Sequence, residues 1–406
     1  MIPFIDLGAQ QKKIYDRIEI RIREVLSHGQ YIMGHEVGEL EDKLRKYAEI
    51  KHVFACSSGT DALLMPLMAY GIGKGDAVFT TPFTFIATAE VIALLGATPV
   101  FVDIDSRTFN IDPAKLKLAV KAVKENDPSI YPLPRDLNPQ PTTPSSQLLP
   151  KGIIAVDLFG LPADYERINA IAEDQRLFVL EDAAQSFGGS YHGKKAGSLA
   201  DVAATSFFPA KPLGCYGDGG AVLTNNDDLA AEIESIRVHG KGKDKYDNTR
   251  IGINGRLDTI QAAILLEKLA IFPDEIEERN RIAKRYSIGL EESVQVPYVP
   301  SGSISVWAQY SIVSDACEEI RQSLQKADIP TAVYYPRPLH LQGAFSGLGY
   351  RPGDFPIAEE TSQKIFSLPM HPYLKDEHVE RIIKIIKSHR GHYRSGHRNI
   401  DNISAL

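Results

Sequence analysis

The sequence predicts an α/β protein that has a large, mainly parallel sheet and a smaller second α/β domain. First, 406 residues are more than one small domain needs. Second, short apolar runs alternate with helical patterns over most of the chain, which is typical of βαβ units. Third, a long helical stretch is followed by a shorter series of strands and helices. We therefore expect a large domain over 1–262, a small domain over 263–390 and a weakly ordered tail over 391–406.

The first fifty residues are predicted to be mainly helical. Ile14, Ile18, Ile22 and Val25 recur at the spacing of one helix face. Residues 35–50 continue in the same style.

Beyond this region the pattern changes to short strands separated by helices. β-branched or apolar runs predict strands at 52–56, 76–81, 99–104, 152–160 and 177–183. Helical patterns lie between them, for example at 60–71 and 87–96. Since such a sheet is mainly parallel, functional residues are expected at the carboxyl ends of its strands.

Three further segments complete the predicted organisation. Residues 127–150 are rich in proline and polar residues, so we expect a surface insertion there. Residues 256–292 have helical periodicity and are expected to contain the passage into the small domain. In that domain we expect strands near 307–313 and 331–335 and helices near 317–327 and 376–389.

Composition and charge exclude several classes of partner. A formal net charge of -7 provides no general basic surface for nucleic acid. Cys56, Cys215 and Cys317 lie far apart without a CxxC pair, so neither a zinc cluster nor a disulfide framework is expected. The sequence shows no signal-peptide pattern and no apolar run of membrane-spanning length. We therefore expect a soluble, cytoplasmic protein that uses no metal and contacts no membrane.

Lys211 is the first candidate catalytic residue. It lies between the aromatic segment "SFFP" and the glycine-rich segment "PLGCYGDGG". A tight, partly desolvated turn would lower the pKa of this lysine and supply a neutral amine that can form a Schiff base. Most lysines are instead solvated and titrate near ~10.4, so the hypothesis depends on the residues around Lys211.

A Schiff-base lysine that serves pyridoxal phosphate needs an acid for the pyridinium nitrogen, a phosphate cradle and a face for the ring. The strand at 177–183 ends in Glu181 and Asp182, and a carboxylate at this position can keep the nitrogen protonated. Gln185 lies three residues further on and can reach the neighbourhood of the ring's phenolic oxygen.

The predicted phosphate cradle is the sequence Ser57-Ser58-Gly59-Thr60, which precedes a helical pattern. The free backbone N–H groups and the dipole of a helix start attract an anion, although most such sequences are ordinary helix caps. Phe85 can supply the stacking face, although a lone aromatic residue is more often part of a core.

With these residues assembled, the chain resembles the DegT/DnrJ/StrS family of pyridoxal-phosphate sugar aminotransferases. The resemblance covers nearly the whole chain apart from 127–150 and the tail. It is carried by "GQYIMGHEVGELEDKL", "SSGTDAL", "TPFTFIATAE", "EDAAQSFG", "SFFPAKPLGCYGDGGAV", "GINGRLDTIQAAIL" and "SLPMHPYL". It implies a fold-type I aminotransferase that forms a homodimer with active sites at the subunit interface.

The resemblance also implies a role for each catalytic candidate. Lys211 becomes the Schiff-base lysine and Asp182 the partner of the pyridinium nitrogen. Gln185 becomes a neighbour of the ring oxygen, and Phe85 the stacking aromatic. Because some family members carry histidine in place of the lysine and dehydrate their substrate, Lys211 favours transamination.

The phosphate is expected to contact the cradle residues Ser58, Gly59 and Thr60 and the hydroxyl of Ser206. The resemblance further implies that Asn254 reaches the phosphate from the partner subunit.

Arg256 resembles a residue that meets a substrate carboxylate, and a structural arginine is an equal alternative. Tyr334 occupies a position where close relatives often have histidine, and it is expected near the sugar or donor.

Within the family, "GCYGDGGAV", "NGRLDTIQAAILLEKL" and "FIDLGAQQKKI" look most like aminotransferases for UDP-2-acetamido-2-deoxy-3-oxo-glucuronate. That resemblance implies L-glutamate as donor and a 3-amino sugar for bacterial surface polysaccharide as product. An aminotransferase for a 4-keto-6-deoxy nucleotide sugar is the alternative. A non-catalytic regulatory protein of the same fold is a further one.

Overall fold

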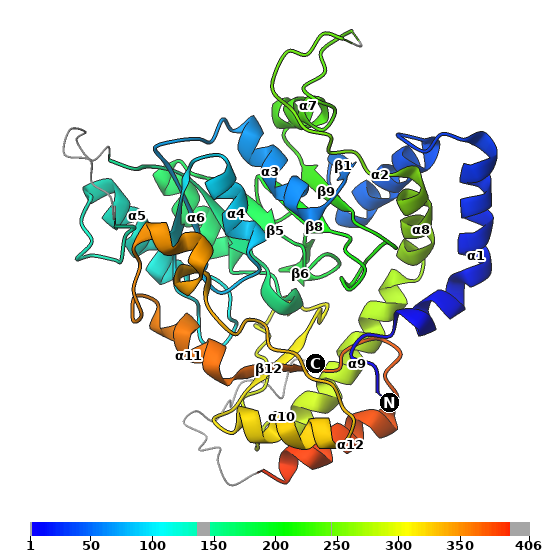
Figure 1. Ribbon diagram of the computed structural model, residues 1–406, viewed down its shortest axis with the longest axis vertical. Coiled ribbons are helices and arrows are strands. Elements are labelled where there is room, and N and C mark those ends of the chain that lie inside the picture. The colour runs from blue at the N-terminus through cyan, green and yellow to red at the C-terminus, as the bar shows by residue number, and fades with distance from the viewer. Residues whose placement is uncertain (1, 136–146, 245, 390–406) are drawn as a thin grey trace.

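The computed structural model describes residues 2–135, 147–244 and 246–389, and a seven-stranded sheet forms the centre of its larger part (Figure 1). From edge to edge the strands are β1 (His52–Cys56), β9 (Gly220–Thr224), β8 (Val202–Ser206), β5 (Phe178–Asp182), β4 (Leu149–Val156), β2 (Asp76–Thr80) and β3 (Thr98–Phe101). β9 is antiparallel to both of its neighbours, whereas β8, β5, β4, β2 and β3 are mutually parallel. The predicted α/β fold with a mainly parallel sheet is therefore confirmed.

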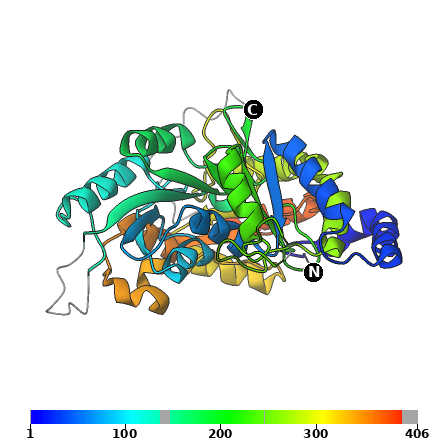
Figure 2. The ribbon, with the colours of Figure 1, turned by 90° about the horizontal axis from the view of Figure 1, so that it is seen from above.

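Helices cover both faces of this sheet (Figure 2). One face packs against α3 (Gly59–Ala69), α4 (Ala87–Leu94) and α7 (Asp227–Ile236). The other face packs against α2 (His35–Ala48), α5 (Pro113–Glu125), α6 (Tyr165–Gln175) and α8 (Thr259–Leu269). Successive strand residues point to opposite faces, so Val78 joins the first core and Phe79 the second.

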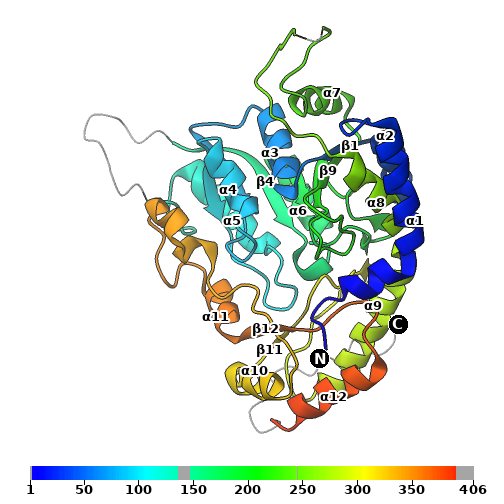
Figure 3. The same ribbon diagram turned by 45° about the vertical axis from the view of Figure 1, so that its right-hand side comes forward.

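Two further groups of elements complete the large part of the chain. The helix α1 (Leu7–His28) lies beside α8 at its outer edge (Figure 3). Short strands form a separate three-stranded sheet from β10 (Ser303–Ile304), β6 (Ser190–Tyr191) and β7 (Lys194–Lys195). Three 3-10 turns are η1 (Leu158–Gly160), η2 (Leu339–Leu341) and η3 (Gly343–Leu348).

A second core lies around a two-stranded antiparallel sheet made of β11 (Tyr310–Val313) and β12 (Ile365–Leu368). Its helices are α9 (Phe272–Leu290), α10 (Cys317–Lys326) and α12 (Asp376–Lys387). The helical segment 256–292 thus forms two helices, α8 and α9, and α9 leads into this core. We propose that the large and small domains divide near the junction between α8 and α9.

One predicted strand is wrong. Residues 331–335 form only an isolated bridge, in which Ala332 pairs with Ser367 of β12. Pro330 and Pro336 flank this segment, and proline cannot donate to a strand ladder, so the pairing does not extend.

The expected insertion and tail fall partly outside the described residues. Residues 136–146 of the segment 127–150 lie outside them, as do residues 390–406, which include the expected tail. At the described ends of the insertion, Tyr131 and Leu133 are buried, and Leu149 begins β4. Within the described residues, no helix is long and apolar enough to cross a membrane.

Asp103 connects the end of the parallel sheet to a helix about 250 residues later in the chain. It follows β3, and its carboxylate accepts hydrogen bonds from the backbone N–H groups of Ile357 (3.1 Å) and Ala358 (2.9 Å). These groups belong to the first turn of α11 (Pro356–Lys364), where a helix leaves N–H groups without internal partners. Lys115 pairs with the same carboxylate at 3.0 Å.

We expect Asp103→Ala to destabilise the protein by about 2 kcal/mol, because it leaves these buried N–H groups of α11 without acceptors. Urea unfolding measures the loss, and hydrogen exchange should accelerate at the backbone N–H groups of Ile357 and Ala358. Asp112→Ala is the matched control, because the Asp112 side chain caps a different helix, α5, by accepting from the N–H groups of Ala114 and Lys115. Unchanged exchange at α11 would contradict this account of Asp103.

Candidate active site

The candidate site lies at the carboxyl edge of the parallel strands. Asp182 is the last residue of β5 and Ser206 is the last residue of the neighbouring β8. The first residue of α3, Gly59, lies against Ser206, since a Cβ atom at Gly59 would be 2.6 Å from the Cβ of Ser206. A side chain at Gly59 would therefore fill the space between the helix start and the strand end.

The start of α3 has the properties of an anion cradle. Ser58 is its N-cap, and its hydroxyl accepts a hydrogen bond from the N–H of Asp61 at 3.1 Å. The next residues, Gly59 and Thr60, supply N–H groups at the positive end of the helix dipole, where a phosphate is stabilised. Ser206 adds a nearby hydroxyl, which accepts from the Phe208 N–H at 3.2 Å.

Lys211 lies in the turn that follows β8, where its own N–H donates to the Phe208 carbonyl at 2.9 Å. The protein around its amine lowers the pKa of Lys211 below the ordinary lysine value, because burial disfavours the charged form. The negative charge of Asp182 acts in the opposite direction and so partly offsets this shift. The amine is therefore easier to deprotonate than that of a solvated lysine.

Asp182 is buried, and burial raises the pKa of its carboxyl group above the usual value. Three interactions oppose that shift. The Thr88 hydroxyl donates to Oδ2 at 2.8 Å, the Ala184 N–H donates to Oδ1 at 3.2 Å, and the charge of Lys211 attracts the carboxylate. These interactions favour the charged carboxylate and partly offset the effect of its burial.

Gln185 has a defined amide orientation. Its Oε1 accepts from the Phe159 N–H at 2.8 Å, so its Nε2 faces the other way and donates to the Tyr335 hydroxyl at 3.3 Å. The ring of Tyr335 packs edge-on against Phe83 at 6.0 Å. The segment that follows β5 and a segment 150 positions later therefore meet here.

Thr88 and Tyr335 are the site residues that sequence reasoning missed. Thr88 lies in the stretch "TPFTFIATAE", one helical turn after Thr84, and Tyr335 directly follows the singled-out Tyr334. Neither residue type indicates a partner by itself, because threonine and tyrosine are common in cores and caps. Only the hydrogen bonds to Asp182 and Gln185 identify them.

Phe85 and Tyr334 lie on the borders of the site. Phe85 precedes α4, three residues before Thr88, and is 56% exposed, so its ring is accessible for stacking. Tyr334 is half-buried, and its ring lies 6.5 Å from that of Phe4 and 5.9 Å from that of Tyr335. Burial raises the pKa of Tyr334.

The segment 254–256 runs beside the start of the cradle in the same chain. The Ser57 N–H donates to the Gly255 carbonyl at 3.2 Å, and Arg256 forms an isolated bridge with Cys56. The Arg256 Nε donates to the exposed Asn254 Oδ1 at 2.9 Å. Both side chains therefore lie together near the protein surface.

The arrangement fits pyridoxal phosphate. Lys211 offers an amine of lowered pKa, Asp182 a hydrogen-bonded buried carboxylate, and the α3 start a cradle kept open by Gly59. These are the groups that the aldehyde carbon, the ring nitrogen and the phosphate of this cofactor require. Fold and site together define the class as a fold-type I pyridoxal-phosphate enzyme.

Comparisons with known proteins identify the family within this class. Residues 12–387 match the model of the DegT/DnrJ/EryC1/StrS aminotransferase family, and the chain belongs to it. The predicted family, enzymatic class and cofactor are confirmed: the protein is an aminotransferase and its cofactor is pyridoxal phosphate.

Three similar proteins illustrate the match. The UDP-2-acetamido-2-deoxy-3-oxo-D-glucuronate aminotransferase of Pseudomonas aeruginosa is 46% identical over 94% of this chain and 98% of its own. A DegT/DnrJ/EryC1/StrS aminotransferase structure from Brucella abortus has a TM-score of 0.90 and 50% identity, over 96% of this chain and all of its own. The Bacillus subtilis structure of ntda, which holds the cofactor PMP, has a TM-score of 0.80 and 28% identity. The match covers 92% of this chain and 81% of that chain.

We expect Thr88→Val to raise the pKa of Asp182 further, because it removes a hydrogen bond that favours the charged carboxylate. A hydrogen bond to a charged group contributes ~1.5–3 kcal/mol, which corresponds to about one pKa unit or more. In its expected role Asp182 is ionised, so activity should be lost at a higher pH as the solution is acidified. The acidic limb of the kcat/KM profile should therefore move upward by about one unit.

Thr205→Val is the control for this substitution, because Thr205 is also buried but donates to the Ala183 carbonyl at 3.2 Å. The acidic limb of the kcat/KM profile of Thr205→Val should stay at the pH found for the unaltered enzyme. Identical pH profiles for the two variants would contradict the assigned role of Thr88.

Proposed function

We propose that this aminotransferase acts on a nucleotide-linked keto sugar, and specifically on UDP-2-acetamido-2-deoxy-3-oxo-glucuronate, with L-glutamate as amino donor. The product would be the 3-amino sugar used for bacterial surface polysaccharide. The observation that carries this proposal is the 46% identity to the P. aeruginosa enzyme over 94% of the chain. Arg256 supports it, because a guanidinium can bind the uronate carboxylate with two parallel hydrogen bonds.

Lys211 has two tasks in this proposal. Pyridoxal phosphate, when bound, supplies an electron sink and carries the amino group between the two substrates. Lys211 holds the cofactor between turnovers. The neutral Lys211 amine would also move a proton between the α-carbon of glutamate and C4′ of the cofactor. The lowered pKa of Lys211 supports this role, because only the neutral amine can accept that proton.

Asp182 keeps the ring nitrogen protonated. A buried carboxylate would otherwise tend to take up a proton itself, and the hydrogen bonds from Thr88 and the Ala184 N–H oppose this. Gln185 and the Tyr335 hydroxyl would then face the opposite, oxygen-bearing side of the ring.

A homodimer would complete the site. Large apolar side chains are exposed near the site segments and on the turn before α2, namely Tyr31, Ile32, Met33, Phe85, Phe208 and Ile251. A subunit interface would cover these side chains and remove their apolar surface from water. In this proposal the partner subunit's Asn254 reaches the phosphate.

We expect Arg256→Ala to lower kcat/KM for the uronate substrate by about 100-fold, because it leaves the substrate carboxylate unpaired. The matching neutral hexose and a 4-keto-6-deoxy nucleotide sugar, each at saturating glutamate, should be turned over slowly by both forms. Release of 2-oxoglutarate measures turnover. Arg250→Ala is the matched control, since Arg250 pairs with Glu232 at 2.9 Å.

Two outcomes would contradict this assignment. Preference of the unaltered enzyme for the 4-keto-6-deoxy sugar would favour that alternative substrate. An equal loss on the uronate and on the neutral hexose would show that Arg256 does not bind the sugar carboxylate.

Mixed dimers test the shared site. Chains with Lys211→Ala and chains with Asn254→Ala should each be impaired alone. In the heterodimer, one site combines an intact Lys211 with the partner's intact Asn254, so we expect activity to return to about half of the unaltered value per dimer. Absence of recovery would place both residues in the same chain's site.

A further inference from the structure

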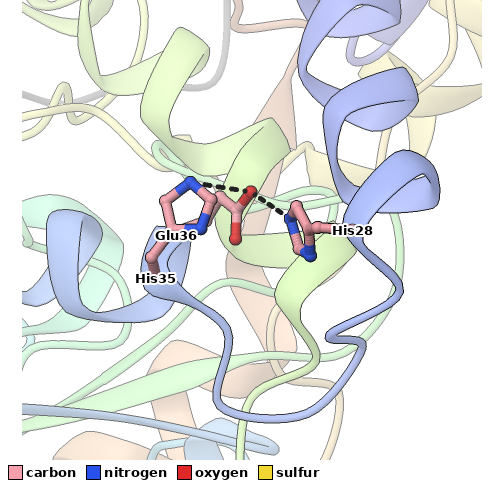
Figure 4. Close-up of side chains that lie close together, drawn as sticks. All are labelled: His28, His35 and Glu36. Atoms are coloured by element: carbon pink, nitrogen blue, oxygen red, sulfur yellow. Dashed lines mark hydrogen bonds and ion pairs between the residues drawn. The ribbon is translucent and has the colours of Figure 1, made fainter.

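The turn between α1 and α2 brings together two histidines and a buried glutamate, none of which is among the candidate active-site residues (Figure 4). His28 is the last residue of α1, and His35 and Glu36 begin α2. One ligand atom from each of the three side chains lies within 4.8 Å of the others.

The Glu36 carboxylate lies between the two imidazole rings (Figure 4). Its Oε1 is 2.9 Å from the His28 Nε2 and 3.3 Å from the His35 Nε2. The ring centroids of the two histidines are 5.1 Å apart. Nitrogen and oxygen ligands about 2.0–2.1 Å from a tetrahedral zinc ion are separated from one another by roughly 3.3 Å, so these spacings are close to those of a coordination sphere.

Glu36 has an unsatisfied oxygen. The side chain is fully buried, yet its Oε2 has no hydrogen-bond partner within the described residues. In that same part of the chain, its ion pairs are with His28 and His35 alone. An oxygen of a buried carboxylate that lacks a partner is costly, and a coordinated metal ion would supply that partner.

We propose that His28, His35 and Glu36 bind a divalent transition-metal ion of the zinc class. Imidazole nitrogen and carboxylate oxygen are ordinary ligands for Zn²⁺, and a fourth position would be taken by water. His35 is 66% exposed along its side chain, so an ion can enter from solvent. The sequence offered no such indication, because the histidines are seven residues apart and match no familiar ligand spacing.

Metal binding would break a hydrogen bond between Gln30 and His28 in this turn. The Gln30 N–H donates to the His28 Nδ1 at 3.0 Å, which places the proton of a neutral His28 on Nε2. Coordination through Nε2 requires the other tautomer, in which Nδ1 carries the proton. The Gln30 hydrogen bond must therefore break when the ion binds.

The ion would connect the end of α1 to the start of α2. The turn between them is already attached to α8, since the Gly34 N–H donates to the Thr259 hydroxyl and the Thr259 N–H to the Tyr31 carbonyl, both at 3.0 Å. A metal ion would therefore stabilise a turn that carries the exposed residues Tyr31, Ile32 and Met33. This role is independent of the proposed sugar substrate.

The test uses the full chain loaded with pyridoxal phosphate, stripped with a chelator and dialysed against zinc chloride near neutral pH. We expect uptake of about one additional zinc ion per chain relative to His35→Ala, and a Tm that rises with zinc concentration. His35→Ala should weaken zinc binding by more than about tenfold. This variant should fold, because the His35 side chain is largely exposed.

His52→Ala is the matched control, because His52 pairs with Asp227 on the surface at 2.6 Å. It should bind zinc like the unaltered protein. Glu36→Gln provides a second test through zinc stoichiometry if it folds, and His35→Ala decides the question if it does not. Equal zinc uptake by His35→Ala and the unaltered protein would overturn the proposal. The proposal would also be overturned if His35→Ala changed only the pH dependence of stability. That result would indicate a histidine–carboxylate ion pair without a metal ion.

Discussion

The site depends on the burial of two groups of opposite charge, the amine of Lys211 and the carboxylate of Asp182. Burial alone favours the neutral form of both, because it lowers the pKa of the lysine and raises that of the aspartate. Each charge opposes the shift of the other, and Thr88 adds a hydrogen bond to the carboxylate. Burial has the larger effect on the lysine, so its amine is moved toward the neutral, reactive form, while the aspartate retains interactions that favour its charge.

The two carboxylates that end β5 have different tasks because successive strand residues point to opposite faces. Asp182 faces Thr88 at the start of α4, on the side of the candidate site. Glu181 instead accepts hydrogen bonds from the backbone N–H groups of Gly197 (2.6 Å) and Leu199 (2.9 Å). Glu181 therefore supports the loop after β7, and Asp182 remains available to the candidate site.

Contacts with the later part of the chain determine the shape of the site border. Asp103 caps α11 across more than 250 positions of sequence, and the Gln185 amide contacts the Tyr335 hydroxyl across 150. Both connections begin at carboxyl ends of parallel strands or directly after them. The edge of the sheet that supplies the catalytic candidates thus also positions the segment around Tyr334.

The sequence by itself determined the α/β class, the order of most strands and helices, and the candidates Lys211, Asp182 and the α3 cradle. These predictions depend on the period of hydrophobic residues, on glycine-rich segments and on the residues at strand ends. All of these are local signals in the sequence. Only the tertiary structure decided that 331–335 is not a strand and that Thr88 and Tyr335 join the site. It alone also revealed the cluster of His28, His35 and Glu36. The physical reason is that a hydrogen bond or a ligand set depends on where distant side chains point, and local sequence does not contain that information.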